Sequence, residues 1–248
     1  MWRFFLQHDS VCDTIVHMIL LLFLFSAMPL MAQSSVHVDT ENTHVRQNKP
    51  TSRVMWHMPR DRRQVALTFD DGPDDDITPQ LLDVLKQHNV RATFFLVGHM
   101  IAKFPHVVAR IANNGHDIAN HTWAHYRLDE MNQDQVGLQL SATTQALHQL
   151  NVPMAPYVRP PGGRFNNYLL HAAKNQQLTM VMWDVNAADY KQADGTFPEP
   201  LVIKHRVLRQ IKPGSIVLMH NSPATLHALP GIIDELKGRG YAIGLLTW

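Results

Sequence analysis

The chain has 248 residues, and its 22 Lys and Arg against 21 Asp and Glu give a formal net charge of +1. This balance provides no basis for nucleic-acid binding or for electrostatic attachment to a membrane surface. Its single cysteine, Cys12, precedes the folded body, which excludes a disulfide, a thiolate zinc site and a cysteine nucleophile there. The 16 histidines are unusual and direct attention to metal-ligand spacing.

The first 60 residues differ in character from the rest of the chain. An apolar run from Ile15 to Ala32 has the length of the hydrophobic region of a secretory signal and nearly the length of a membrane span. We therefore expect residues 1–32 to be a signal peptide or membrane anchor, and the protein to be exported as a periplasmic, membrane-anchored or secreted protein. Residues 33–60 are polar and lack periodicity, which predicts a flexible linker. The folded body is expected to run from Asp61 to Trp248.

Within the body, apolar β-prone runs alternate with amphipathic stretches, which predicts an α/β fold with parallel crossovers, either a barrel or an open sheet. The predicted strands are Val65–Phe69, Ala92–Val97, Asp117–Asn120, Tyr157–Arg159, Thr179–Asp184, Ser215–Met219 and Ala242–Leu246. The predicted helices begin at Thr78, with Thr78 as the cap, and at Pro105, and cover Gln133–Leu150, Asn166–Asn175, Pro200–Ile211 and Pro230–Lys237. Functional groups of such a fold gather at the carboxyl ends of the strands.

Two adjacent carboxylates, Asp70 and Asp71, follow the first predicted strand and precede Gly72-Pro73, which ends regular structure. At a strand end both acids can reach one pocket, where one can hold a metal while the other accepts a proton. The alternative is an ordinary surface turn, because Asp-Asp-Gly-Pro is also good turn chemistry.

His121 and His125 follow the third predicted strand, four residues apart. On a helical turn this spacing places both imidazoles on one face, so that both can reach one ion. With Asp71 they form a His, His, carboxylate set, and three ligands with a fourth position left to water are typical of catalytic zinc. Ordinary polar histidines are the alternative.

Five motifs occur in an order that resembles the polysaccharide deacetylases of the NodB-homology type, carbohydrate esterase family 4. They are Thr68–Pro73, His121–His125, Arg159–Gly163, Asn186–Tyr190 and Leu218–His220. The resemblance covers most of 65–246 and implies a distorted (β/α)7-type barrel, the NodB-homology fold. It also implies hydrolysis of an N-acetyl group on an amino sugar by a metal-bound water.

The resemblance assigns roles residue by residue. Asp70 would be the catalytic base, oriented and kept charged by Arg159. His220 would be the general acid that protonates the leaving amine, held by Asp189. The metal ligands would be Asp71, His121 and His125, with Zn²⁺ the first choice and Co²⁺ or Ni²⁺ alternatives. The substrate pocket would include Gly162, whose neighbourhood offers a backbone N–H to the oxyanion, together with Tyr190 and Trp183.

Two motifs depart from the family pattern. Gly162 stands where the family often has an aromatic residue, which removes one wall of the sugar pocket. Asn186 and Tyr190 replace the usual Asp and Trp of the fourth motif. These departures bear on substrate preference rather than on activity.

The resulting expectation is a metal-dependent hydrolase that deacetylates peptidoglycan, a chitin oligomer or an exopolysaccharide. An O-acetyl esterase acting on a polymer such as acetylated xylan is the alternative, and a non-catalytic glycan-binding protein is a further one. The partner is therefore a polysaccharide, with membrane contact only through an N-terminal anchor. The sequence leaves the polymer and the oligomeric state open.

Overall fold

The computed structural model describes residues 53–247. The expected signal or anchor of residues 1–32, and the linker up to residue 52, lie outside the described residues. Among those described, no helix is both long enough and apolar enough to span a membrane.

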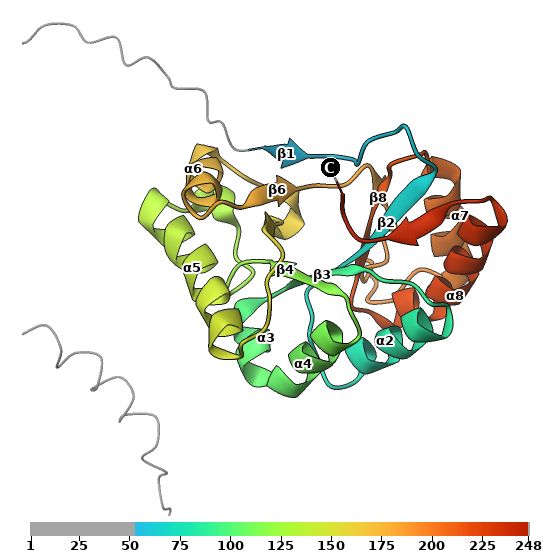
Figure 1. The fold of residues 1–248 in the computed structure, drawn as a ribbon, viewed down its shortest axis with the longest axis horizontal. Helices are drawn as coiled ribbons and strands as arrows, with labels where there is room; N and C mark the ends of the chain where they lie inside the picture. The colour runs from blue at the N-terminus through green and yellow to red at the C-terminus, as the bar shows by residue number, and fades with distance from the viewer. Residues whose placement is uncertain (1–52, 248) are drawn as a thin grey trace, which may run out of the picture. The chain divides into compact units, whose positions relative to one another are not determined.

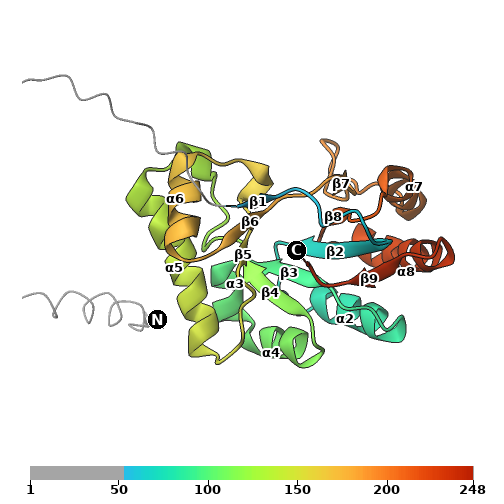
Figure 2. The same cartoon turned by 45° about the horizontal axis from the view of Figure 1, so that its top comes forward.

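The described strands form one parallel sheet in the order β1-β6-β5-β4-β3-β2-β8-β7, with β9 pairing beside β2. The strands are β1 (Val54–Met55), β2 (Gln64–Asp70), β3 (Thr93–Leu96), β4 (Asp117–Asn120), β5 (Tyr157–Val158), β6 (Thr179–Val181), β7 (Val185–Asn186), β8 (Ile216–His220) and β9 (Ala242–Gly244). The sheet curls, and its helices lie on the outer face (Figure 1 and Figure 2). The predicted α/β fold with a distorted (β/α) barrel is confirmed.

The helices follow the strands as parallel crossovers require. They are α2 (Ile77–Gln87), α3 (Gly98–Lys103), α4 (Pro105–Asn113), α5 (Gln133–Gln149), α6 (Asn167–Asn175), α7 (Pro200–Gln210) and α8 (Pro223–Gly238), with 3₁₀ turns η1 (Leu128–Glu130) and η2 (Pro161–Gly163). Figure 2 shows α5 and α6 on one side of the curled sheet, α4 and α2 below it, and α8 and α7 on the other side.

The side chains of the central strand β2 alternate between the helix-covered face of the sheet and the barrel interior. Val65, Leu67 and Phe69 alternate along it and belong to the large apolar cluster shared with the helices. Ala66 belongs instead to the smaller interior cluster. By the same alternation Thr68 and Asp70 point into the barrel, so two polar side chains are built into its interior.

Four boundary predictions were wrong. Strand pairing already begins at Val54, where β1 pairs with β6, ahead of the expected start of the folded body near Asp61. Of the run Thr179–Asp184, only β6 (Thr179–Val181) is a strand, and the separate strand β7 begins after the run, where the chain pairs with β8 instead of β5. Helix α8 begins at Pro223 rather than Pro230, which lies inside it.

The fourth error concerns α2. Its N-cap is Asp76, and Asp74 Oδ1 accepts hydrogen bonds from the backbone N–H groups of 76, 77 and 78. Thr78, the predicted cap, donates its hydroxyl to Asn221 Oδ1 at 2.9 Å. Asn221, which follows the distant strand β8, therefore accepts the hydroxyl hydrogen bond of Thr78, a residue that the sequence pattern assigns to the helix cap.

Candidate active site

The charge pair between Asp70 and Arg159 lies at the centre of the site. Arg159 is fully buried, and its Nη1 donates to Asp70 Oδ1 at 2.7 Å and to Thr68 Oγ1 at 2.8 Å. Its other nitrogens donate to the carbonyls of Val181 and Met182, and its guanidinium lies over the Phe95 ring at 4.0 Å. A buried charge is tolerated when it is paired and hydrogen-bonded, and here each of the three guanidinium nitrogens donates at least one hydrogen bond. Asp70 Oδ1 is therefore fixed, and Oδ2 is left toward the cavity.

Asp71 follows Asp70 with a φ of 79°. In a continuing strand the two side chains would point to opposite faces. The left-handed backbone at Asp71 instead turns its carboxylate to the same rim as Asp70. The predicted convergence of the two acids is found, and the left-handed backbone at Asp71 produces it.

Three groups then gather at one point. Asp71 Oδ1 lies 3.1 Å from His125 Nε2 and 3.5 Å from His121 Nε2, and the potential ligand atoms lie within 4.8 Å of one another. Burial raises the pKa of Asp71, but hydrogen bonds with His121 and His125 outweigh it and hold this pKa well below its ordinary value. The pKa of His125 is raised, chiefly by its hydrogen bond with Asp71.

This donor set fits a divalent cation. His121 Nδ1 lies 2.8 Å from the Arg159 carbonyl, so that nitrogen donates and the lone pair of Nε2 faces Asp71. Two imidazoles, one carboxylate and a side open to solvent match the chemistry of a catalytic zinc site.

The predicted helical turn between the two histidines was wrong. Residues 121–125 form a loop in which Thr122 has a φ of 67° and His125 a φ of 56°. Asn120 holds this loop: its Oδ1 accepts from the Thr122 N–H at 2.9 Å and its Nδ2 donates to the Leu140 carbonyl of α5. Thr122 Oγ1 then accepts from the His125 N–H.

His220 and Asp189 form the second pair. His220 Nδ1 lies 2.7 Å from Asp189 Oδ1, and the His220 backbone N–H donates to Asp189 Oδ2 at 2.7 Å. Asp189 is fully buried and also accepts a hydrogen bond from the Thr225 hydroxyl of α8. Burial alone would lower the pKa of His220, but Asp189, with Asp70 and Asp71, raises it to about 9. The imidazole is thus a cation with its Nε2 side available to the cavity.

A cavity of about 330 Å³ brings these groups together. Its lining includes the predicted residues Asp70, Asp71, His121, His125, Gly162, Trp183, Tyr190 and His220, and also Lys191, Phe197, Leu218, Asn221 and Ser222. Arg159 and Asp189 lie behind it, in contact with Asp70 and His220. Every predicted site residue therefore lies at this cavity or directly beneath it.

Several members of the site were missed from sequence. Asn221 links the end of β8 to the loop after β2, since its side chain contacts Asp74 and Thr78 and its N–H donates to the Asp70 carbonyl. Its position directly after His220 was the available signal. The position of Lys191 directly after Tyr190 was a comparable signal. Phe197 and Thr225 carried none, because a loop brings Phe197 to the cavity and α8 brings Thr225 to Asp189.

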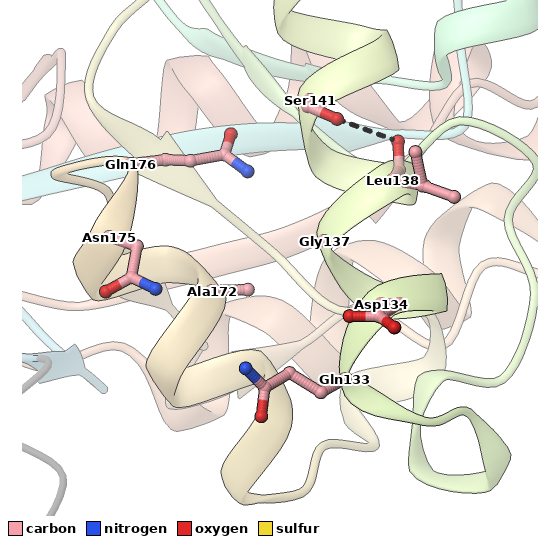
Figure 3. A pocket seen from close by; sticks show the side chains of 8 residues that line it. All are labelled: Gln133, Asp134, Gly137, Leu138, Ser141, Ala172, Asn175 and Gln176. Carbon is pink, nitrogen blue, oxygen red and sulfur yellow. Dashed lines mark hydrogen bonds between the residues drawn. The ribbon is translucent and has the colours of Figure 1, made fainter. Parts of the chain in front are cut away.

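A separate groove of about 420 Å³ lies between α5 and α6 (Figure 3). Its lining consists of Gln133, Asp134, Gly137, Leu138, Ser141, Ala172, Asn175 and Gln176. None of the predicted site residues lines this groove, so the chemistry is concentrated in the smaller cavity.

Comparison with known proteins agrees with this geometry. A family model described as polysaccharide deacetylase matches residues 57–181. The chain belongs to the polysaccharide deacetylase family. It is 41% identical over 187 residues to a peptidoglycan-N-acetylglucosamine deacetylase of Bacillus cereus, covering 73% of this chain and 66% of that protein.

Two solved structures resemble this polysaccharide deacetylase family member closely. The Bc1960 peptidoglycan N-acetylglucosamine deacetylase superposes with a TM-score of 0.74 at 38% identity, covering 79% of this chain and 91% of that one. BA3943, a CE4 family pseudoenzyme from Bacillus anthracis, gives a TM-score of 0.74 at 30% identity, covering 79% and 68%. The family therefore contains both active and inactive members on this fold.

The third motif of this polysaccharide deacetylase family member forms an irregular turn. Gly162 and Gly163 have φ values of 60° and 69°. A Cβ on Gly163 would lie 2.7 Å from the Trp183 ring, whereas a Cβ on Gly162 would meet nothing within 4 Å. The sequence predicts that the sugar pocket lacks one wall at Gly162, and the space beside Gly162 is indeed open. Trp183 packs against the neighbouring Gly163.

Proposed function

We propose that the chain is a divalent-cation-dependent hydrolase that removes N-acetyl groups from N-acetylglucosamine-type units of peptidoglycan or a related extracellular polysaccharide. The observation that carries this proposal is the single cavity onto which a buried carboxylate, a charged imidazole and a His, His, Asp set all open. A binding protein has no need of a base and an acid held by separate buried partners.

Asp71, His121 and His125 would hold the cation, with zinc favoured by the ligand types and cobalt or nickel as alternatives. When bound, such a cation lowers the pKa of a coordinated water and polarises a carbonyl oxygen. The His121 imidazole is oriented before binding by the Arg159 carbonyl, and the backbone of His125 is held by Thr122 Oγ1, which reduces the cost of assembling the site.

Asp70 would accept the proton of the attacking water through Oδ2, because Oδ1 is engaged by Arg159. His220, protonated and held by Asp189, would give a proton to the departing nitrogen. A backbone N–H near Gly162 would donate to the developing oxyanion. Trp183, Tyr190 and Leu218 offer apolar surface to the acetyl methyl group. The products are acetate and a free amine.

The chemistry of the site and the names of the relatives both support this substrate class. Amide hydrolysis requires a protonated leaving amine, which accounts for the charged His220. The Bacillus cereus relative and the Bc1960 structure are both named for peptidoglycan N-acetylglucosamine. An exported chain would meet this polymer in the cell envelope.

Acetate release from peptidoglycan, chitin oligomers and acetylated xylan, before and after chelation, tests the proposal. We expect release from the N-acetylated polymers, its loss on chelation and its return with Zn²⁺, Co²⁺ or Ni²⁺. Release from acetylated xylan alone would favour the O-acetyl esterase. Binding of the polymers without any release would identify the chain as a non-catalytic glycan-binding protein.

A further inference from the structure

The carboxylate of Asp189 is held by a group that the proposed reaction does not use. Its Oδ1 lies 2.7 Å from His220 Nδ1, and its Oδ2 accepts the His220 N–H at 2.7 Å. The Thr225 hydroxyl of α8 also bonds to Oδ2. Because an ionised carboxylate has no hydrogen to give, the hydroxyl is the donor. Asp189 is therefore fixed in part by a residue that lies outside the five motifs.

The start of α8 determines the direction of this hydrogen bond. Thr225 is the third residue of the helix, and Ser222 is the N-cap. Ser222 Oγ accepts the Thr225 N–H at 3.2 Å and lies 3.1 Å from Thr225 Oγ1. Since the single hydrogen of the Thr225 hydroxyl goes to Asp189, Ser222 is the donor between the two hydroxyls. The hydroxyls form a directed chain that ends on the carboxylate, and hydrogen bonds in such a chain strengthen one another.

These groups are shielded from solvent. Thr225 and Asp189 are both 0% exposed, and Ser222 is 6% exposed. A substitution that removes the Thr225 hydroxyl but keeps the volume of the side chain leaves no space for a water in its place. Asp189 Oδ2 then keeps only the His220 N–H, and a buried acceptor that loses a donor is costly.

The backbone that leads to Asp189 has a separate support. Arg206 of α7 donates from Nη1 to the carbonyls of Ala187 and Ala188, each at 2.8 Å. These bonds fix the main chain ahead of Asp189, whereas Thr225 bonds to the carboxylate itself. Removing the Thr225 hydroxyl therefore loosens the carboxylate and leaves the course of the backbone in place.

We propose that Thr225 is a positioning residue for the general acid: its hydroxyl holds the Asp189 carboxylate in the orientation that directs His220 Nε2 to the leaving amine. This inference rests on the proposed function, because it requires a leaving group that needs a proton. An amine leaves poorly unless it is protonated, whereas 4-nitrophenolate leaves as an anion. Loss of the Thr225 hydroxyl should therefore slow amide hydrolysis and spare the hydrolysis of an activated ester.

Thr225→Val tests the inference, because it keeps the branched shape of the side chain and removes the hydroxyl. We expect kcat for tetra-N-acetylchitotetraose to fall about tenfold, with KM within about twofold of wild type. Hydrolysis of 4-nitrophenyl acetate should stay within about twofold of wild type. Thr225→Ser returns the donor and should restore kcat for the tetramer to within about threefold. Equal losses on both substrates, or no loss on the tetramer, would overturn the inference, since a threonine that only packs gives those results.

Thr143→Val is the matched control. Thr143 is also 0% exposed, and its hydroxyl donates to the Gln139 carbonyl within α5 at 3.1 Å. It does not line the catalytic cavity. Both substrates should therefore be hydrolysed within about twofold of wild type. A selective loss of amide hydrolysis in Thr143→Val as large as that in Thr225→Val would also overturn the inference.

A measurement on His220 separates this inference from the proposed function. Exchange of the His220 Nδ1 hydrogen with solvent is followed by NMR in the full-length protein, labelled with ¹⁵N-histidine and loaded with Zn²⁺. The exchange rate should rise about tenfold in Thr225→Val and return toward the wild-type rate in Thr225→Ser. Faster exchange in Thr225→Val supports the inference even if no polymer releases acetate. Unchanged exchange overturns it even if deacetylation is observed.

Discussion

Arg159 shows how one residue organises the candidate site. It is the largest fully buried side chain among the described residues, and four hydrogen bonds and an aromatic face satisfy its guanidinium. Its carbonyl simultaneously orients His121. The side chain of this residue thus fixes the proposed base, while its backbone fixes a proposed metal ligand.

Substituting Asp70 tests the assignment of the base. Asp70→Asn keeps an oxygen near Arg159 but cannot accept a proton, so turnover should fall by about 10²–10⁴-fold. Metal content, measured after dialysis, should stay at the wild-type level because Asp71, His121 and His125 are unchanged. His125→Ala should lose both metal and activity. Near-full activity in Asp70→Asn would exclude Asp70 as the base.

The pH dependence tests His220. Its folded pKa of about 9 lies above the ordinary value of 6.5, so its contribution to stability is complete below about pH 6.5 and is lost as pH rises through about 9. The proposed acid requires the protonated form, so activity should also fall as pH rises toward and beyond 9.

Asp189→Asn removes the charge that raises the pKa of His220, so the basic limb of the kcat profile should move to lower pH by about one unit or more. Asp134→Asn, which removes a charge from the distant α5–α6 groove, is the control and should leave the limb in place. If the basic limb of the kcat profile stays in place in Asp189→Asn, another group controls the fall in kcat at high pH.

Sequence predicted the residues of the site better than their local geometry. The family resemblance carried by the five motifs implied that Asp70 lies near Arg159 and His220 near Asp189. The loop carrying His121 and His125 was predicted as a helical turn, because spacing alone cannot reveal the positive φ values of Thr122 and His125. Phe197 reaches the cavity through the fold of a long loop, which has no periodic signal.

At the scale of elements, the turn Pro161–Gly163 offers a matched pair of substitutions. Both Gly162→Ala and Gly163→Ala place a Cβ at positive φ, which costs about 1–2 kcal/mol in each case. Gly163→Ala also drives the Cβ into the Trp183 ring at 2.7 Å, whereas the Cβ at Gly162 enters open space. Gly163→Ala should therefore lower both the urea midpoint and kcat/KM more than Gly162→Ala does. Equal losses would mean that Trp183 moves aside without cost.

The missed elements have two causes. β1 and β7 are two-residue strands, too short to show alternation, and they exist because neighbouring strands pair with them. The start of α8 has a local cause, because Ser222 is the N-cap, its hydroxyl accepts the Thr225 N–H and Pro223 occupies the first turn. Tertiary context therefore explains the two short strands, whereas the earlier start of α8 was a local signal that the sequence prediction overlooked.

At the scale of the whole folded unit, residues 54–58 are part of the barrel. Met55 and Met58 are 3% and 1% exposed, and the Met58 N–H donates to the Gly214 carbonyl at 2.7 Å. A chain shortened to begin at Asp61 should lose about 3–6 kcal/mol of unfolding free energy, from about 1.5–3 kcal/mol for each buried Met. Urea unfolding of chains that begin at Asn48 and at Asp61 measures this difference. Equal stabilities would show that these side chains only rest on the surface.

The end strands of the main strand order, β1 and β7, are both two residues long, and the branching edge strand β9 has three residues. Such short edges offer few unpaired backbone groups to another molecule, which protects a parallel sheet against self-assembly. Loss of β1 would expose the edge of β6, which carries the apolar residues Met180 and Val181. The shortened chain should consequently aggregate at high concentration. Light scattering should detect this aggregation before any change in helix content appears.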